Sequence, residues 1–174
     1  MITKHLAIAL AAFSAVSLCG TELWNGGGDT VRVTMKMTNH QVTVSDGALT
    51  VEATSNDEKY GYLTFDIPVT PFQFEGKSLA LEYRLIKPLE GDSFYVKCLD
   101  AQSQVVASFY TFARPEQWMR LICSPGQNTG GVTFFAKNIK APEGTTVTRI
   151  QFFAGRKCKD TPVKVEIRNI GLIE

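Results

Sequence analysis

Apolar residues recur at every second position through most of this chain, and that period limits what it can fold into. In the segment 31–38, VRVTMKMT, the apolar side chains of Val31, Val33, Met35 and Met37 alternate with polar ones. A period of two with one apolar face is typical of a half-buried antiparallel strand. No segment shows a sustained helical period with helix caps. The chain is therefore expected to be all-β.

About eleven segments are predicted as strands, and stretches containing Gly, Pro, Asn and Asp separate them. They are 31–38, two runs within 41–54, and 62–68, 78–86, 93–100, 105–112, 117–124, 132–139, 146–155 and 163–173. Asp46 and Gly47 lie between the two runs of 41–54 and suit a two-residue hairpin turn. Pro68 is expected to close its strand. Short strands with such turns predict an antiparallel sandwich or barrel.

Residues 1–19 are expected to be a signal peptide, with 20–174 forming a single domain. Lys4 and His5 give a short basic start, and an uncharged, mostly apolar run follows at 6–18. This run suits a signal peptide and is shorter than the ~20 residues that span a bilayer. A buried N-terminal helix is the alternative. No second apolar run occurs, so we expect no membrane span and an exported protein, either extracellular or in the periplasm or cell envelope.

The cysteines raise separate questions of anchoring and pairing. Cys19 would receive lipid in a bacterial lipoprotein signal, although the bulky Leu18 before it departs from that pattern. A lipid anchor there remains an alternative. Cys98, Cys123 and Cys158 would meet an oxidising compartment, where paired thiols persist. An odd number allows at most one disulfide within the chain. Buried reduced thiols are an equal alternative for Cys98 and Cys123.

Charge and motifs exclude several classes of function. The chain has 18 Lys and Arg against 17 Asp and Glu, a formal net charge of +1. It lacks the basic excess expected of a protein that follows nucleic-acid phosphates, so no nucleic acid is expected as a partner. No nucleophile elbow, zinc-protease helix or phosphate-binding loop motif occurs. His40 is a candidate base only by elimination, and an ordinary polar residue beside a strand is the alternative.

The carboxylates on the predicted strands do not indicate a catalytic pair. Glycoside hydrolases need two carboxylates facing one cleft. Four carboxylates lie on predicted strands: Glu52, Asp66, Glu82 and Glu166. They alternate with apolar neighbours, which is the pattern of solvated residues on an outer face. We therefore expect no catalytic residue, no cofactor and no enzyme activity.

The C-terminal part of the chain carries a family resemblance. A turn at 142–145, PEGT, precedes an apolar strand, and the last strand reads VEIRNIGL at 165–172. This resembles the closing strands of jelly-roll carbohydrate-binding modules of the galactose-binding-like superfamily, where the last strand often reads V-x-I-D-N-I-x-L. The segments 23–26, 46–49 and 75–76 fit the same plan. The resemblance covers most of 22–174 and implies an antiparallel β-sandwich (jelly roll) of about ten strands.

The same resemblance bears on metal binding. Many modules of this type hold a structural calcium ion through an acidic residue of the last strand, and Arg168 stands at the matching position. A guanidinium cannot ligate Ca²⁺, which takes several oxygen ligands. Glu22 and Asp29 could supply carboxylates, but the expected site is broken. No metal ion is therefore predicted.

Aromatic side chains supply the candidate binding residues, because a flat ring can stack on the C–H face of a sugar. The ligand-binding candidates are Tyr60, Tyr62, Trp24 and Trp118. Tyr60 is the first choice because it lies in a polar loop, whereas a core position is the alternative for both Trp24 and Trp118. The Phe pairs at 134–135 and 152–153 are expected to be wall and core rather than ligand platform.

Two functional classes follow. The first is a secreted, non-catalytic carbohydrate-binding protein whose partner is a polysaccharide or glycan. The second is a structural or protein-interaction β-sandwich domain of the cell envelope with no glycan ligand. An exposed row of two or three aromatic rings would favour the first class, and a flat polar surface without them would favour the second.

Overall fold

The computed structural model describes residues 20–24, 26–34, 36–56, 61–86, 93–112, 114, 116–124 and 144–174. The described elements are β1 (Thr21–Glu22), the 3₁₀ turn η1 (Gly28–Thr30), β2 (Arg32–Val33), β3 (Met37–Ser45), β4 (Ala48–Ser55), β5 (Leu63–Phe72), β6 (Ser78–Leu85), β7 (Ser93–Leu99), β8 (Val105–Phe112), β9 (Met119–Cys123), β10 (Val147–Ala154) and β11 (Pro162–Ile173). None of these elements is an α-helix, as the period of two predicts.

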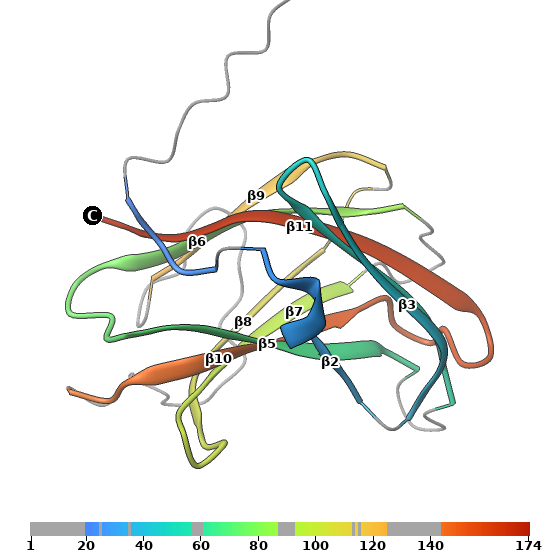
Figure 1. The fold of residues 1–174 in the computed structure, drawn as a ribbon, viewed down its shortest axis with the longest axis horizontal. Helices are drawn as coiled ribbons and strands as arrows, with labels where there is room; N and C mark the ends of the chain where they lie inside the picture. Colours follow the sequence, from blue (N-terminus) through green and yellow to red (C-terminus); the bar gives the residue numbers. More distant parts are fainter. Residues whose placement is uncertain are drawn as a thin grey trace, which may run out of the picture.

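The strands form two antiparallel sheets that lie face to face (Figure 1). One has the order β3-β4-β11-β6-β9, with β1 added along β11, and is called the six-stranded sheet below. The other, the five-stranded sheet, has the order β2-β5-β10-β7-β8. Most neighbours in a sheet are distant in sequence, because the chain crosses repeatedly from one layer to the other. The predicted all-β antiparallel sandwich is therefore confirmed.

The core fills the space between the sheets and consists of the apolar half of each alternating pattern. Its largest fully buried side chains are aromatic, among them Tyr83, Phe65, Phe94 and Phe152. The rings of Tyr83 on β6 and Phe94 on β7 stack 4.1 Å apart and nearly parallel, which joins the two layers. Phe152 stacks 5.2 Å from Phe65, its partner on the neighbouring strand β5. Each sheet therefore has one face committed to this core.

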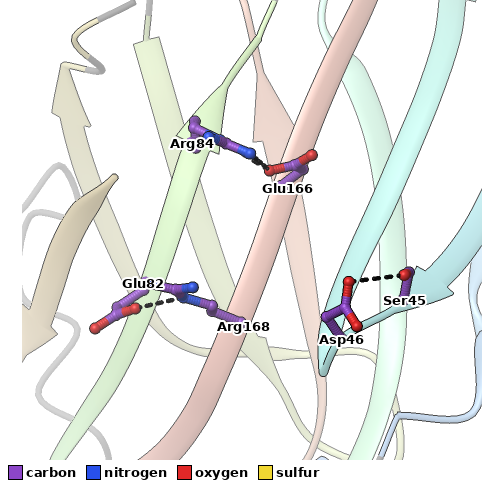
Figure 2. Close-up of polar contacts among 6 residues, drawn as sticks. All are labelled: Ser45, Asp46, Glu82, Arg84, Glu166 and Arg168. Atoms are coloured by element: carbon purple, nitrogen blue, oxygen red, sulfur yellow. Dashed lines mark hydrogen bonds and ion pairs between the residues drawn. The ribbon is translucent and has the colours of Figure 1, made fainter. Parts of the chain in front are cut away.

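The hairpin predicted at residues 41–54 is present. Strands β3 and β4 are joined by Asp46 (φ 51°) and Gly47 (φ 72°), so both turn residues have positive φ. The Ser45 hydroxyl donates a hydrogen bond of 3.2 Å to the Asp46 carboxylate beside the turn (Figure 2). This two-residue geometry matches the right-handed twist of the strands that it connects.

The strand predicted at 31–38 is wrong as a single element. The chain forms β2 in the five-stranded sheet, turns through a hydrogen bond of 2.9 Å from Met37 N to Thr34 O, and enters β3 in the six-stranded sheet. Met37 is buried and Val31 and Val33 pack against the core. The alternation predicts which side chains are buried, but it cannot predict that the chain passes from one sheet to the other within this segment.

Pro68 does not end β5, which continues to Phe72 and so corrects the predicted stop. Pro68 faces outward opposite Arg149, beside the irregularity in register between Val147 and Arg149. On its other side, β2 pairs with β5 only at residues 65 and 66. A residue without an N–H fits at such an irregular or unpaired position of a strand.

The segments predicted as a signal peptide (1–19) and as a strand (132–139) lie outside the described residues. Within the described part of the chain, no helix has the length and apolarity that crossing a membrane requires. The described cysteines are buried and form no disulfide with one another: Cys98, Cys123 and Cys158. Burial raises the pKa of the Cys98 and Cys123 thiols, which therefore stay protonated as small core side chains.

Candidate functional site

Aromatic side chains occupy the outer face of the five-stranded sheet, where polar residues are usual. They alternate with core residues along four neighbouring strands. We call them the aromatic row: Tyr62 just before β5, Phe153 on β10, Tyr95 on β7, and Tyr110 and Phe112 on β8. Tyr95 lies directly opposite Phe153 on one side and Tyr110 on the other. The strand order therefore assembles the row from segments that are far apart in sequence.

The rings of the aromatic row contact one another in an unbroken chain. The ring centroids are 5.9 Å apart for Tyr62 and Phe153, 5.3 Å for Phe153 and Tyr95, and 6.3 Å for Tyr95 and Tyr110. Phe112 extends the chain at 5.1 Å from Tyr110, with 65% of its surface exposed. All four distances lie in the range of attractive aromatic pairs. Adjacent strands are about 4.8 Å apart, so the row extends roughly 14 Å from β5 to β8.

A second line of side chains runs beside the aromatic row and is polar. We call it the polar row: Arg32, Asp66, Gln151, Lys97 and Ser108, which are register partners across all five strands. On β10, β7 and β8 it lies two residues along the strand from Phe153, Tyr95 and Tyr110, a rise of about 6.7 Å. The Tyr95 hydroxyl and Ser108 Oγ share a hydrogen bond of 3.1 Å that links the two rows.

One end of the polar row is an ion pair. The guanidinium of Arg149 lies 3.3 Å from the Asp66 carboxylate and also donates a hydrogen bond to Ser103. Burial raises the pKa of Asp66, while the positive charges of Arg149 and Arg32 oppose that rise. Asp66 is therefore held in place by cations on both neighbouring strands.

Lys97 lies further along the polar row, between Gln151 and Ser108, and against the aromatic rings. Its ammonium group is 4.8 Å from the ring centroid of Phe153 and 5.5 Å from that of Tyr95. Both distances are within the range of cation–π contacts. Burial against these rings lowers the pKa of Lys97. The sheet thus presents flat apolar rings beside hydrogen-bonding and charged groups.

Of the candidates named from the sequence, the structure brings only Tyr62 into the aromatic row, and Tyr60 lies outside the described residues. Trp24 is a core residue with 7% of its surface exposed, so it has no open ring face to offer a ligand. Among the described residues its indole Nε1 has no hydrogen-bond partner.

Trp118 lies at the six-stranded sheet, just before β9, and cations cover it. The guanidinium carbons of Arg168 and Arg84 are 4.0 and 4.8 Å from its ring centroid. These arginines also pair with acids across β6 and β11 (Figure 2): Arg168 donates to Glu82 at 2.6 Å, and Arg84 donates to Glu166. Trp118 therefore belongs to an ionic network on the opposite side of the sandwich from the aromatic row.

This ionic network also accounts for the predicted outer-face carboxylates. Glu82 accepts from Arg168 and, at 3.2 Å, from Asn169, and Glu166 is engaged by Arg84. Arg168, at the position where the sequence resemblance led us to expect an acid, makes an ion pair with Glu82. The described residues contain no cluster of three or more His, Cys, Asp or Glu side chains that could hold a metal ion.

Four members of the aromatic row were not named as candidates from the sequence: Phe153, Tyr95, Tyr110 and Phe112. The expectation that 152–153 is wall and core is correct for Phe152, which is fully buried, whereas Phe153 faces outward between Tyr62 and Tyr95. The period of two contains the signal, because Phe153 alternates with the buried residues 152 and 154. The pair at 134–135 lies outside the described residues.

Comparison with known proteins identifies the fold. No protein-family model matches the chain, and no curated protein sequence matches it significantly. Among solved structures, a family 11 carbohydrate-binding module from Clostridium thermocellum, in complex with a β-1,3-1,4-mixed-linked tetrasaccharide, has a TM-score of 0.52 at 11% identity, covering 88% of this chain and 95% of that one. The chain has the fold of β-sandwich carbohydrate-binding modules.

Two further structures show the same architecture. A structure of carbohydrate-binding modules from the β-sandwich superfamily has a TM-score of 0.55 at 10% identity, covering 92% of this chain and 64% of that one. An agarase has a TM-score of 0.59 at 13% identity, covering 88% of this chain and 24% of the agarase. The chain thus spans about a quarter of the agarase's length.

Proposed function

We propose that this chain is a secreted, non-catalytic carbohydrate-binding protein of the galactose-binding-like superfamily that binds a polysaccharide or glycan along the aromatic row. The observation that carries the proposal is the unbroken chain of rings from Tyr62 to Phe112 on an outer sheet face. A structural domain without a ligand has no need of such a face, because partly exposed rings in a contiguous patch cost solubility.

The two rows match the chemistry of a sugar chain. The C–H faces of pyranose rings are apolar and flat, so they stack on aromatic side chains, while the hydroxyl groups need donors and acceptors at the edges. The side-chain amide of Gln151 in the polar row supplies both, and Gln151 lies two residues from Phe153 on β10. Four neighbouring strands give a platform about 14 Å long, which suits a short stretch of extended glycan lying across the strands.

The distribution of carboxylates favours binding over hydrolysis. On the described strands of the five-stranded sheet the only carboxylate is Asp66, and it pairs with Arg149. The strand carboxylates Glu52, Glu82 and Glu166 belong to the other sheet. Glycoside hydrolysis uses two carboxyl groups roughly 5–10 Å apart on either side of one bond, whereas the two sheets of a sandwich are about 10 Å apart with their outer faces turned away from each other.

Similar structures support the same role. The match to the family 11 module extends over 95% of that module's chain, and the module was solved in complex with a tetrasaccharide. The agarase match involves about a quarter of a larger enzyme. Export follows from the basic start and apolar run of residues 1–19 and is consistent with a ligand found outside the cell.

The proposal is tested by affinity electrophoresis of residues 20–174 through gels that contain soluble polysaccharides. We expect retardation by at least one polysaccharide, and loss of that retardation in Tyr95→Ala. The matched control is Trp118→Ala, which removes an aromatic ring from the opposite sheet and should leave the retardation unchanged. Retardation that survives Tyr95→Ala but disappears in Trp118→Ala would place the binding site on the six-stranded sheet and refute the aromatic row. Absence of retardation by every polysaccharide would refute the carbohydrate-binding function.

A further inference from the structure

The near-neutral chain conceals a charge asymmetry between its two outer faces. The described strands of the five-stranded sheet carry three cations, Arg32, Lys97 and Arg149, against the single carboxylate of Asp66, a net charge of +2. The strands of the six-stranded sheet carry four acids and four cations, which balance: Glu22, Glu52, Glu82, Glu166, Arg84, Arg120, Lys164 and Arg168. The excess positive charge therefore lies on the face that holds the aromatic row.

Lys97 carries one of these two unbalanced positive charges. Asp66 is shared between Arg149, at 3.3 Å, and the positive charge of Arg32. No carboxylate of the described residues makes an ion pair with Lys97, whose ammonium instead lies against Phe153 and Tyr95. Burying a cation away from water is costly unless it is paired. The lowered pKa of Lys97 reflects this cost. The fold thus holds an uncompensated positive charge inside the proposed binding face.

We propose that the glycan bound by the aromatic row is anionic, carrying a carboxylate or sulfate group that pairs with the ammonium of Lys97. This inference rests on the proposed function. An ammonium can also donate to hydroxyl groups, but a neutral sugar would cover Lys97 and leave its charge without a counterion. An anionic group supplies charge-assisted hydrogen bonds in their place. A compact ammonium accommodates either a carboxylate or a sulfate, since it imposes no planar geometry on its partner.

The test compares pairs of polysaccharides that share one sugar backbone and differ in whether it carries an anionic group. One pair is polygalacturonate and its methyl ester, and the other is a sulfated galactan and its desulfated form. We expect the anionic member of at least one pair to bind at least about tenfold more tightly in titration calorimetry, the loss typical of a missing hydrogen bond to a charged group. The two pairs distinguish a carboxylate from a sulfate. Binding should also weaken as salt shortens the Debye length from about 10 Å at 0.1 M to about 3 Å at 1 M.

Three variants assign the preference to Lys97. Lys97→Met should bring the affinities for the anionic and neutral members together, whereas Lys97→Arg should keep most of the difference. The control is Lys164→Met, a lysine on β11 of the opposite sheet, which should leave the preference intact. Lys97→Met should also melt close to the parent protein, because the loss of its cation–π contacts and the removal of a partly desolvated cation oppose each other. A markedly lower melting temperature would mean that Lys97 serves the fold.

The outcomes separate this inference from the function on which it rests. Equal affinity for charged and neutral members, abolished in both cases by Tyr95→Ala, would keep the glycan-binding function and overturn the anionic ligand. A preference for the anionic member that persists in Lys97→Met would overturn the role of Lys97. Binding to no member of either pair, together with no retardation in the broader polysaccharide gels, would overturn both proposals.

Discussion

Phe152 and Phe153 are adjacent residues of one type on opposite faces of β10, so replacing each in turn gives a sharp test of the structure. Phe152 is fully buried, with ring neighbours Phe65 at 5.2 Å and Phe94 at 5.9 Å. Truncating a buried Phe to Ala typically costs about 3–5 kcal/mol, because it leaves a cavity as well as removing apolar contacts. Phe152→Ala should therefore remove a large share of a domain stability that is typically about 5–15 kcal/mol.

Phe153→Ala should cost less stability and more binding. Its ring makes two aromatic contacts, worth about 0.5–1.5 kcal/mol each, and one cation–π contact with Lys97 worth about 0.5–1 kcal/mol. The site is partly exposed, so we expect the free energy of unfolding to fall by about 2 kcal/mol. Loss of one stacking ring should weaken glycan binding by about 1–3 kcal/mol, by analogy with stacking of aromatic side chains on nucleic-acid bases.

Urea unfolding followed by fluorescence measures the stabilities, and affinity electrophoresis measures the binding. The milder Phe152→Leu keeps a folded protein with a perturbed core, and it should retain the retardation that Phe153→Ala loses. An unchanged dependence of the unfolding free energy on urea concentration confirms that the two variants are compared between the same states. A stability loss for Phe153→Ala as large as that of Phe152→Ala would refute the outward placement. Full binding by a folded Phe153→Ala would refute the aromatic row as the site.

Two further predictions concern the fold. Gly47 and Gly61 both have positive φ, but an added Cβ would meet open space at Gly47 and would lie 2.6 Å from the backbone nitrogen of Lys159 at Gly61. In urea unfolding, Gly47→Ala should therefore lower the free energy of unfolding by about 1–2 kcal/mol, and Gly61→Ala should lower it clearly more. Equal losses would refute the close approach at Gly61. Because burial raises the folded-state pKa of the Cys98 thiol, its stabilising contribution is fully present below the unfolded pKa of about 8.5 and is lost as pH rises above that value. Cys98→Ala should therefore show a shallower loss of stability between neutral and alkaline pH, whereas an identical slope would contradict the buried thiol.

Local sequence patterns predict most of the strands, because each depends on neighbours in the chain. The hairpin at Asp46 and Gly47 follows from two residues that tolerate positive φ. The alternation in β6, β7, β10 and β11 marks their buried faces directly. Two features depend on other strands instead: the change of layer after Val33, and the continuation of β5 through Pro68. Both features are determined by which strand pairs with which, and a period of two in the sequence does not identify the pairing partner.

The candidate site was harder to predict because sheet order, rather than chain order, assembles it. Phe153 and Tyr95 lie opposite each other only because β10 pairs with β7, two strands that are far apart in sequence. The alternation does place Tyr95, Lys97 and Phe153 on the non-core side of their strands, and reading outward aromatic residues as a group would have indicated the face. Attention to loops favoured Tyr60 and Trp24, since loops commonly carry function.

Placing a binding surface on a sheet rather than on loops has a thermodynamic consequence. Each ring of the aromatic row is fixed on one side by a backbone whose other face packs in the core, and on the other by its neighbouring rings. Little conformational entropy is then left to lose when a ligand binds, whereas a loop must be ordered at that moment. Lys97 adds a cost in the opposite direction, because its charge is partly desolvated before any ligand arrives. A platform that is rigid and carries an uncompensated cation is expected to discriminate by charge among glycans of similar shape, since the rings accept any stackable sugar and the ammonium favours those that bring an anion.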